Sequence, residues 1–303
     1  MAKFTPIQWT DSSVNPTMGC DGCELWNTKT DVRRCYAGVI TSRFGKTNPG
    51  LANDFDVVEL APGRMAEAAG WNDLRGTQRA GAGDKAKPWL DHLPRLIFVS
   101  DMADALSVAV PFDYLRDEII VNVASELGRR HHWQWLTKQP QRMAEFSAWL
   151  EQQGIQWPAN LWVGTSITTQ ATTSRIRRLL NVGNHNTIRF LSVEPQEQAI
   201  DLSAYIGNLD WIIQGGESGP KSHTFDLGWA RDIRDRCRTL GVPYFLKQLG
   251  RRVSDGGQPV KFKDASGGDW SEWPADLRVR LMPIDASGQK RRLSPLAGAA
   301  EGL

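Results

Sequence analysis

The sequence predicts an α/β fold, with a TIM-like (β/α) barrel, complete or partial, as its architecture. Three observations lead to this prediction. Short apolar runs alternate with amphipathic stretches, a pattern typical of a parallel sheet with crossover helices. The apolar runs contain few polar residues, as strands buried on both faces do. Polar residues follow the runs, where the carboxyl ends of parallel strands gather. A doubly wound open sheet is the alternative architecture.

The predicted strands are four to six residues long and rich in β-branched, aromatic and leucine residues. They are Leu96–Val99, Trp133–Leu136, Leu161–Gly164, Ile188–Val193, Trp211–Gln214 and Pro243–Leu246. Upstream, Val57–Leu60 is a candidate further strand, and Val14–Met18 leads directly into the first cysteine. Together these segments predict about eight β-α units, the number in a complete barrel.

Two helices are predicted from the spacing of apolar residues. Phe112–Leu127 repeats apolar residues every four positions, as a helix packed on a sheet does. Trp229, Ile233 and Cys237 mark one face of a second helix, which stops at Gly241. We therefore interpret Cys237 as a buried core residue.

Two regions depart from the alternating pattern. Residues 72–94 begin with a polar, glycine-rich stretch and are expected to form a flexible insertion. After Gly250 the chain becomes rich in Gly, Asp and Ser. The predicted organisation is a barrel over residues 1–250 and a small C-terminal appendage over residues 251–303, with a short hairpin and a floppy tail.

The composition excludes several classes of protein. With 303 residues, 41% hydrophobic residues and a net charge of +2, the chain is not a disordered polymer. No apolar run approaches the roughly 18 residues of a membrane span, and the N-terminus lacks a signal-peptide pattern. We expect a cytoplasmic protein without a membrane association. The scattered histidines and the absence of a Gly-x-Ser-x-Gly motif disfavour hydrolytic zinc sites and serine hydrolases.

The residues that follow the predicted strands predict a binding pocket, because the carboxyl ends of parallel strands converge. Their side chains are hydroxyls, carboxylates, amides and amines, together with two glycines that would let a ligand approach the backbone. The alternative is that they cap helices and fill turns. The residues are Ser100, Asp101, Lys138, Thr165, Ser166, Glu194, Gly215, Gly216, Glu217, Lys247 and Gln248.

Three cysteines, Cys20, Cys23 and Cys35, lie within sixteen residues after the first predicted strand. Three thiolates are one fewer than a closed structural zinc site requires. They suit a [4Fe–4S] cluster whose fourth iron stays open for a ligand. Two other interpretations remain open, namely a zinc site completed by an Asp or His, and reduced structural cysteines.

Taken together, these motifs resemble those of a phage- and plasmid-borne three-cysteine family that is related to radical S-adenosylmethionine (SAM) enzymes. The motifs occur in the same order over roughly 250 residues of the chain. They are Ile7–Thr10, Asn15-Pro16, Gly19-Cys20, Cys35–Ala37, Ser100–Met102, Leu136–Pro140, Val193–Pro195, Gly215–Gly219 and Lys247-Gln248.

The resemblance implies a barrel of the radical SAM type with a [4Fe–4S] cluster on Cys20, Cys23 and Cys35. An external one-electron reductant would drive SAM cleavage to a 5′-deoxyadenosyl radical, which abstracts a hydrogen atom from substrate. The expected SAM-binding residues are Ser100, Asp101, Thr165, Ser166, Glu194, Gly215, Gly216 and Glu217. The expected substrate contacts are Lys138, Lys247 and Gln248.

Some relatives occur in phage gene clusters that hypermodify thymine, which implies an isomerase acting on a modified base in DNA or a nucleotide. A phage-encoded member would work in the host cytoplasm. Basic and aromatic residues are interleaved, as around Arg129-Arg130 and Arg175–Arg178, and could meet phosphates and bases. The alternative for Arg175–Arg178 is the solvated face of a helix.

The cysteine spacing departs from the usual radical SAM pattern, Cys-x-x-x-Cys-x-x-Cys with an aromatic residue before the last cysteine. Here eleven residues separate Cys23 from Cys35, Arg34 precedes Cys35, and Tyr36 follows it. The residue that would stack on adenine is therefore not assigned. Two rival functions follow from the same residues: a zinc-dependent nuclease or hydrolase on the same barrel, and a non-catalytic nucleic-acid-binding partner protein.

Overall fold

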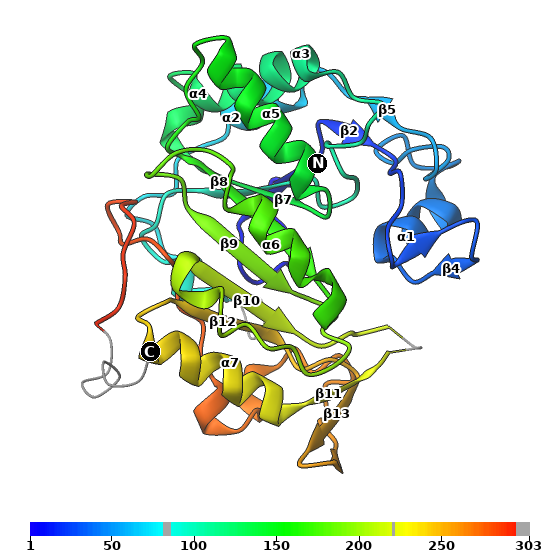
Figure 1. Ribbon diagram of the computed structural model, residues 1–303, viewed down its shortest axis with the longest axis vertical. Coiled ribbons are helices and arrows are strands. Elements are labelled where there is room, and N and C mark those ends of the chain that lie inside the picture. The colour runs from blue at the N-terminus through cyan, green and yellow to red at the C-terminus, as the bar shows by residue number, and fades with distance from the viewer. Residues whose placement is uncertain (81–85, 220–221, 295–303) are drawn as a thin grey trace. The chain divides into compact units, whose positions relative to one another are not determined.

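The computed structural model describes residues 1–80, 86–219 and 222–294 (Figure 1). The chain forms two compact units. Unit 1 comprises Met1–Leu74, Pro94–Gly164 and Asn181–Thr187, and unit 2 comprises Arg75–Leu93, Thr165–Leu180 and the chain from Ile188 onward. Each unit contains strands, with helices connecting them.

The main sheet has seven strands in the order β1-β6-β7-β8-β9-β10-β12. The order follows the chain, and β1 pairs parallel with β6, β6 with β7, and β10 with both β9 and β12. A doubly wound sheet reverses its strand order at a switch point, whereas a (β/α) barrel does not. The strand order is therefore compatible with a partial β/α barrel, which confirms the α/β prediction at this coarser level.

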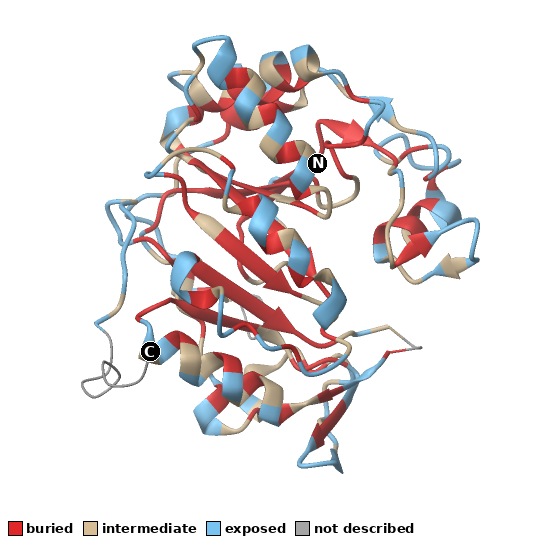
Figure 2. Cartoon of the chain, viewed as in Figure 1, coloured by how far each residue is buried: buried red, intermediate tan, exposed pale blue. Residues whose placement is uncertain are grey.

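The predicted strands are confirmed, with small changes at their ends. Their residues are almost all buried (Figure 2), because an apolar strand covered on both faces loses the most apolar surface to water. In unit 1 the strands are β1 (Ser12–Val14), β6 (Leu96–Val99), β7 (His132–Thr137) and the first part of β8 (Leu161–Ile167). Those of unit 2 are β9 (Arg189–Val193), β10 (Trp211–Gly215) and β12 (Tyr244–Gln248).

Two segments predicted as strands differ from expectation. Val57–Leu60 is not a strand of the parallel sheet. Its last two residues form β5 (Glu59–Leu60), which is exposed and pairs antiparallel with β2 (Thr17–Met18). Val14–Met18 divides into β1 and β2 at Pro16, because proline has no N–H to donate to a sheet. A small hairpin pairs β3 (Trp26–Asn27) with β4 (Val32–Arg33).

The two predicted helices are present. Phe112–Ala124 is helical, with one wide π-helical turn, η3 (Arg116–Ile120), between α3 (Phe112–Leu115) and α4 (Val121–Ala124). The second is α7 (Leu227–Thr239), on which Cys237 is fully buried, as predicted. The other helices are α1 (Tyr36–Phe44), α2 (Arg64–Ala69), α5 (Pro140–Gln152) and α6 (Ser174–Leu179). Short 3-10 turns are η2 (Pro88–Leu90), η4 (Gly128–Arg130), η5 (Gln170–Thr173), η6 (Ile206–Asn208), η7 (Trp270–Glu272) and η8 (Ala275–Leu277).

The predicted C-terminal hairpin is formed by β13 (Arg252–Asp255) and β14 (Gln258–Val260), with β11 (Thr224–Asp226) parallel to β13. Beyond it, the Leu246 N–H donates to the Val279 carbonyl at 2.9 Å, so this segment lies against β12 within unit 2. The predicted tail over residues 295–303 lies outside the described residues.

The predicted insertion, residues 72–94, is described on both sides of residues 81–85, which lie outside the described chain. The His92 N–H donates to the Thr77 carbonyl at 2.8 Å, which holds the two sides together. Among the described residues, none of the helices has the length and apolar character needed to cross a membrane.

Candidate functional site

The three cysteines lie on the segment that leaves β1 in unit 1. Each has its backbone N–H fixed by a carbonyl at 2.8 Å: Cys20 by Phe55, Cys23 by Trp26, and Cys35 by Leu25. Cys35 is also the residue that precedes the first turn of α1. These three hydrogen bonds lie outside the regular bonding of helices and strands, and they fix the backbone at each cysteine.

Two features of the chain allow this arrangement. Gly19, before the first cysteine, has a φ of 77°, and a Cβ there would come within 1.9 Å of the Val57 carbonyl oxygen. Behind the cysteines, Trp26, Ala37 and Phe55 form a small apolar cluster that packs against Cys20 and Cys35. The thiols are therefore held at the edge of an apolar support, and all three are partly exposed.

The thiols lie close enough for their charges to interact. Burial, with smaller contributions from negative charge on Asp104, Cys23 and Cys35, raises the pKa of Cys20 to about 12. Burial also raises the pKa of Cys23, while the nearby Lys138 ammonium lowers it. Three thiolates here need a positive partner, which a metal centre supplies by binding them in deprotonated form.

The donor set fits an iron–sulfur cluster in its chemistry, because sulfur is the ligand such clusters use. Within the described ranges, no three Cys, His, Asp or Glu side chains are grouped tightly enough to hold a single metal ion. This finding includes Cys20, Cys23 and Cys35, so their assignment as cluster ligands rests on their sulfur chemistry and not on a preformed metal geometry among the described residues.

Asp104 is a site residue that the sequence prediction missed. It is buried, and it accepts hydrogen bonds from the Thr137 hydroxyl at 2.8 and 2.9 Å and from the Lys138 N–H at 3.0 Å. Burial raises the pKa of this carboxyl. Asp104 thereby fixes the end of β7, which carries Lys138, beside Cys20 and Cys23. The only sequence signal was a second aspartate shortly after Asp101.

Asp21, between the first two cysteines, was also missed. Its carboxylate accepts hydrogen bonds from the Ser107 hydroxyl at 2.7 Å, the Val108 N–H at 2.9 Å and the Gln139 side chain at 3.4 Å. These partners follow β6 and β7, so one carboxylate joins the cysteine segment to the loops of two other strands. No pattern in the sequence indicated that it would.

Replacement of Asp21 by Asn is expected to reduce cluster loading rather than folding. Asparagine keeps the shape but loses a charge-assisted acceptor, at a cost of about 1–3 kcal/mol in the local structure. We expect at least a threefold drop in iron bound per chain after reconstitution, with an unchanged thermal unfolding midpoint. Iron analysis and circular dichroism check this, with Asp31→Asn on the exposed β3–β4 turn as the control. Full iron loading of Asp21→Asn would contradict it.

Ser100 lies where the sequence predicts a ligand contact, at the end of β6. Its φ is 73°, a conformation that residues other than glycine rarely adopt. The side chain is 6% exposed, and its hydroxyl has no hydrogen-bond partner in the described structure. Backbone strain together with an unsatisfied buried hydroxyl is a combination found at binding sites.

Replacement of Ser100 by Ala should separate stability from ligand binding. Removing an unsatisfied buried hydroxyl raises the free energy of unfolding, by about 1 kcal/mol. For SAM, the ligand that the sequence resemblance implies, loss of one hydrogen bond should weaken binding about tenfold. Urea denaturation and the KM for SAM check the two parts. An unchanged KM would remove Ser100 from the binding site.

Asp101, the next predicted residue, is held in place by its neighbours. Its carboxylate accepts a hydrogen bond from the Asn15 amide at 2.6 Å, and the Asn15 oxygen accepts one from the Met102 N–H at 2.9 Å. The Tyr36 hydroxyl donates to the Asp101 carbonyl at 2.9 Å. Burial raises the pKa of the Asp101 carboxyl. The loops after β1 and β6 therefore meet at the cysteines.

The predicted residues of unit 2 form a group of their own. The Lys247 ammonium and the Glu194 carboxylate form an ion pair at 2.6 Å, although the sequence analysis assigned them to substrate and SAM respectively. The Gln248 amide donates to the Gly216 carbonyl at 2.9 Å. A Cβ on Gly216 would come within 2.2 Å of the Leu249 carbonyl oxygen. Packing within the chain thus already accounts for the glycine at position 216.

The remaining predicted residues of unit 2 are Gly215, Glu217, Thr165 and Ser166, of which Gly215 is the last residue of β10. The Glu217 carboxylate accepts a hydrogen bond from the His223 N–H at 3.1 Å and lies 3.2 Å from its ring nitrogen. Thr165 and Ser166 are buried within β8. Of the residues predicted either to meet nucleic acid or to form a solvated helix face, Arg177 and Arg178 are exposed on α6, which is compatible with both interpretations, and Arg175 is half-buried and donates to the Ser166 carbonyl at 3.0 Å.

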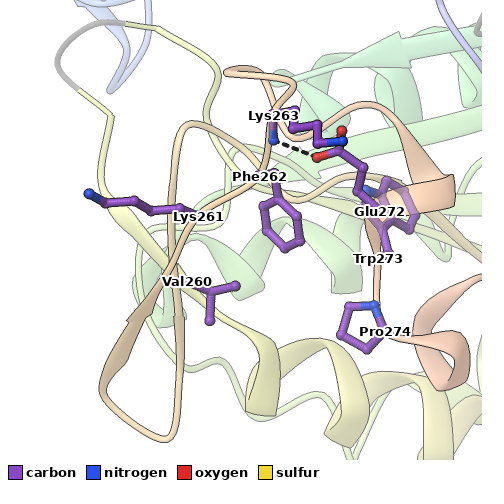
Figure 3. Close-up of a pocket in the computed structure, with 7 residues that line it drawn as sticks. All are labelled: Val260, Lys261, Phe262, Lys263, Glu272, Trp273 and Pro274. Carbon is purple, nitrogen blue, oxygen red and sulfur yellow. Dashed lines mark hydrogen bonds between the residues drawn. The ribbon is translucent and has the colours of Figure 1, made fainter.

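A cavity of about 530 Å³ lies in unit 2 between β14 and the turn that precedes η8 (Figure 3). Phe262, Val260 and Pro274 line it, with Lys261 and Lys263 beside them. None of the predicted site residues is among its lining residues. We therefore take the cysteines of unit 1 as the candidate site, because their thiols can bind a metal centre and no predicted site residue lines this cavity.

Comparison with known proteins gives one match. The profile of a family described as "Protein of unknown function (DUF5131)" matches residues 4–289. No curated protein and no solved structure gives a significant match. The matched range contains both units up to residue 289 and all of the site residues described above. The chain is therefore a member of the DUF5131 family.

Proposed function

We propose that this protein is a radical SAM enzyme in which Cys20, Cys23 and Cys35 hold a [4Fe–4S] cluster. The observation that carries the proposal is the group of three partly exposed thiols at the end of β1, whose charges interact with one another. A three-thiolate cluster keeps one iron open for a ligand. The finer assignment, isomerisation of a nucleobase substituent in DNA, is supported by the sequence resemblance alone.

When bound, the cluster would supply the electron that cleaves SAM to methionine and a 5′-deoxyadenosyl radical. The chain's own residues would bind the cluster and orient the ligand beside it. Lys138 favours the thiolate form of Cys23, since its ammonium lowers the pKa of that thiol. Asp104 holds the Lys138 backbone in place. The Ser100 hydroxyl is placed to bond a polar group of a ligand that enters beside the cysteines.

The unit 2 residues have a supporting part in this proposal. Glu194 and Lys247 neutralise each other at 2.6 Å, so neither would meet a ligand as an isolated charge. A polar ligand group at this place would contact an ion pair and accept a hydrogen bond from Lys247 or donate one to Glu194. Their assignment as contacts to SAM and substrate is supported by the sequence resemblance alone.

Anaerobic reconstitution of the full chain with iron and sulfide tests the proposal. We expect about four irons and four sulfides per chain. After reduction with dithionite, the protein should convert SAM to 5′-deoxyadenosine, measured by chromatography. A chain that binds one zinc ion, takes up no iron and leaves SAM intact would overturn the proposal and favour the zinc hydrolase.

A further inference from the structure

Helix α1 begins directly after Cys35 and has an outward face with no acidic residue. Tyr36, Val39 and Phe44 on this helix are 53%, 43% and 47% exposed. The apolar side of α1 is covered by the cysteine segment, through the buried Ala37 and Trp26. Aromatic side chains of this size are usually buried, so two exposed rings on one short helix require a reason.

Exposed basic residues lie on and near α1, and the Arg43 guanidinium lies 5.9 Å from the ring centre of Phe44. Arg43 and Lys46 are exposed at the end of α1, and Lys29 is exposed on the turn between β3 and β4. Residues 24–53 carry a net charge of +3, whereas the whole chain carries +2. The segment that begins directly after Cys23 and contains Cys35 and α1 therefore carries an excess of positive charge.

The same helix is joined to the candidate site. The Tyr36 hydroxyl donates to the Asp101 carbonyl at 2.9 Å, and Cys35 is its neighbour in the chain. Tyr36 therefore connects the exposed side of α1 to the loop after β6 and is adjacent in the chain to Cys35. Val108, which is 74% exposed, donates its N–H to the Asp21 carboxylate at 2.9 Å.

We infer that the exposed face of α1, defined by Tyr36, Val39, Arg43, Phe44 and Lys46, is the docking surface for single-stranded DNA. Unpaired bases stack on exposed rings, and phosphates pair with basic side chains. A duplex hides the faces of its bases, so it offers these rings nothing to stack on. An acidic protein would use the cations but not the aromatic rings.

This inference deepens the proposed function, because it gives a DNA substrate its route to the cysteines. Binding itself needs no cluster. The proposed function and the docking surface can therefore fail separately. SAM cleavage in the absence of DNA tests the proposed function, and DNA binding by the full chain tests the docking surface on α1.

Fluorescence anisotropy with a labelled single-stranded oligonucleotide, over a range of salt concentrations, is the experiment. Arg43→Glu with Lys46→Glu should weaken binding at least tenfold. The slope of log affinity against log salt should fall by about 1.4, since each phosphate contact contributes about 0.7 on single strands. Phe44→Ala should weaken binding at least about fivefold and leave the slope unchanged, because stacking involves no counterion.

The matched control is Arg177→Glu with Arg178→Glu, which reverses two exposed cations on α6 and should change affinity less than twofold. Circular dichroism confirms that every variant folds. The inference is overturned if the α1 variants bind as the wild type does, if the α6 variant loses as much affinity, or if polyglutamate competes as well as unlabelled oligonucleotide.

Discussion

Replacement of Cys20 by Ala should abolish cluster binding and reduce SAM cleavage at least about a thousandfold. Cys20 is one of the three thiols assigned to the cluster, and a cluster held by three thiolates loses a third of its protein ligands with it. Two thiolates hold a cluster too weakly to survive gel filtration. Iron and sulfide analysis and the rate of 5′-deoxyadenosine formation measure the two effects.

The matched control is Cys237→Ala, which removes the fourth cysteine of the chain. Cys237 is fully buried on α7, and burial alone raises the pKa of its thiol. This variant should lose about 1–2 kcal/mol of stability from the small cavity while retaining its full iron content. Equal iron loading of Cys20→Ala and Cys237→Ala would contradict the assignment of the ligands.

Replacement of Arg280 by Ala is expected to give the largest loss of stability, about 3 kcal/mol or more. The guanidinium of Arg280 is 7% exposed and lies 4.3 Å from the ring centre of Trp89, 5.0 Å from Trp270 and 5.1 Å from Trp273. Cation–π contacts of a desolvated arginine contribute about 2 kcal/mol. Burial lowers its pKa to about 10, so the surroundings tolerate the charge only because these contacts offset the lost hydration.

Arg280 also fixes the end of β12. Its Nε donates to the Leu246 carbonyl at 3.1 Å and its Nη2 to the Lys247 carbonyl at 2.8 Å. Urea denaturation measures the loss. Arg280→Lys should recover only part of it, because a lysine cannot stack a planar group on three indoles. The exposed Arg177→Ala should cost less than about 0.5 kcal/mol. A change below 1 kcal/mol for Arg280→Ala would contradict the prediction.

Much of the main sheet could be predicted because its strands are buried on both faces and therefore read as apolar runs. Leu96–Val99 matches β6 residue for residue. The prediction that Val57–Leu60 belongs to the parallel sheet was wrong. A high content of β-branched residues does not indicate which strand a segment pairs with, and β5 pairs with β2 at the surface. The tryptophans follow the same rule, since Trp133, Trp135 and Trp162 are fully buried in unit 1.

The candidate site was only partly predictable. The cysteines and Ser100 could be found, because close thiol spacing and the position after a strand are local signals. Asp21 and Asp104 could not, because their roles depend on partners about 30 to 120 residues away in the chain. The pairing of Glu194 with Lys247 also joins distant segments, 53 residues apart, and only the fold brings them to 2.6 Å.

The sequence by itself therefore determined the α/β class, the strands of the main sheet and the three thiols, because hydrophobic periodicity and cysteine spacing are properties of the chain alone. Only the tertiary structure decided which carboxylates hold the cysteine segment, that Ser100 is strained with an unpaired hydroxyl, and that the rings of α1 face outward. Each of these depends on contacts between residues distant in sequence, and burial and charge at such contacts exist only once the chain has folded.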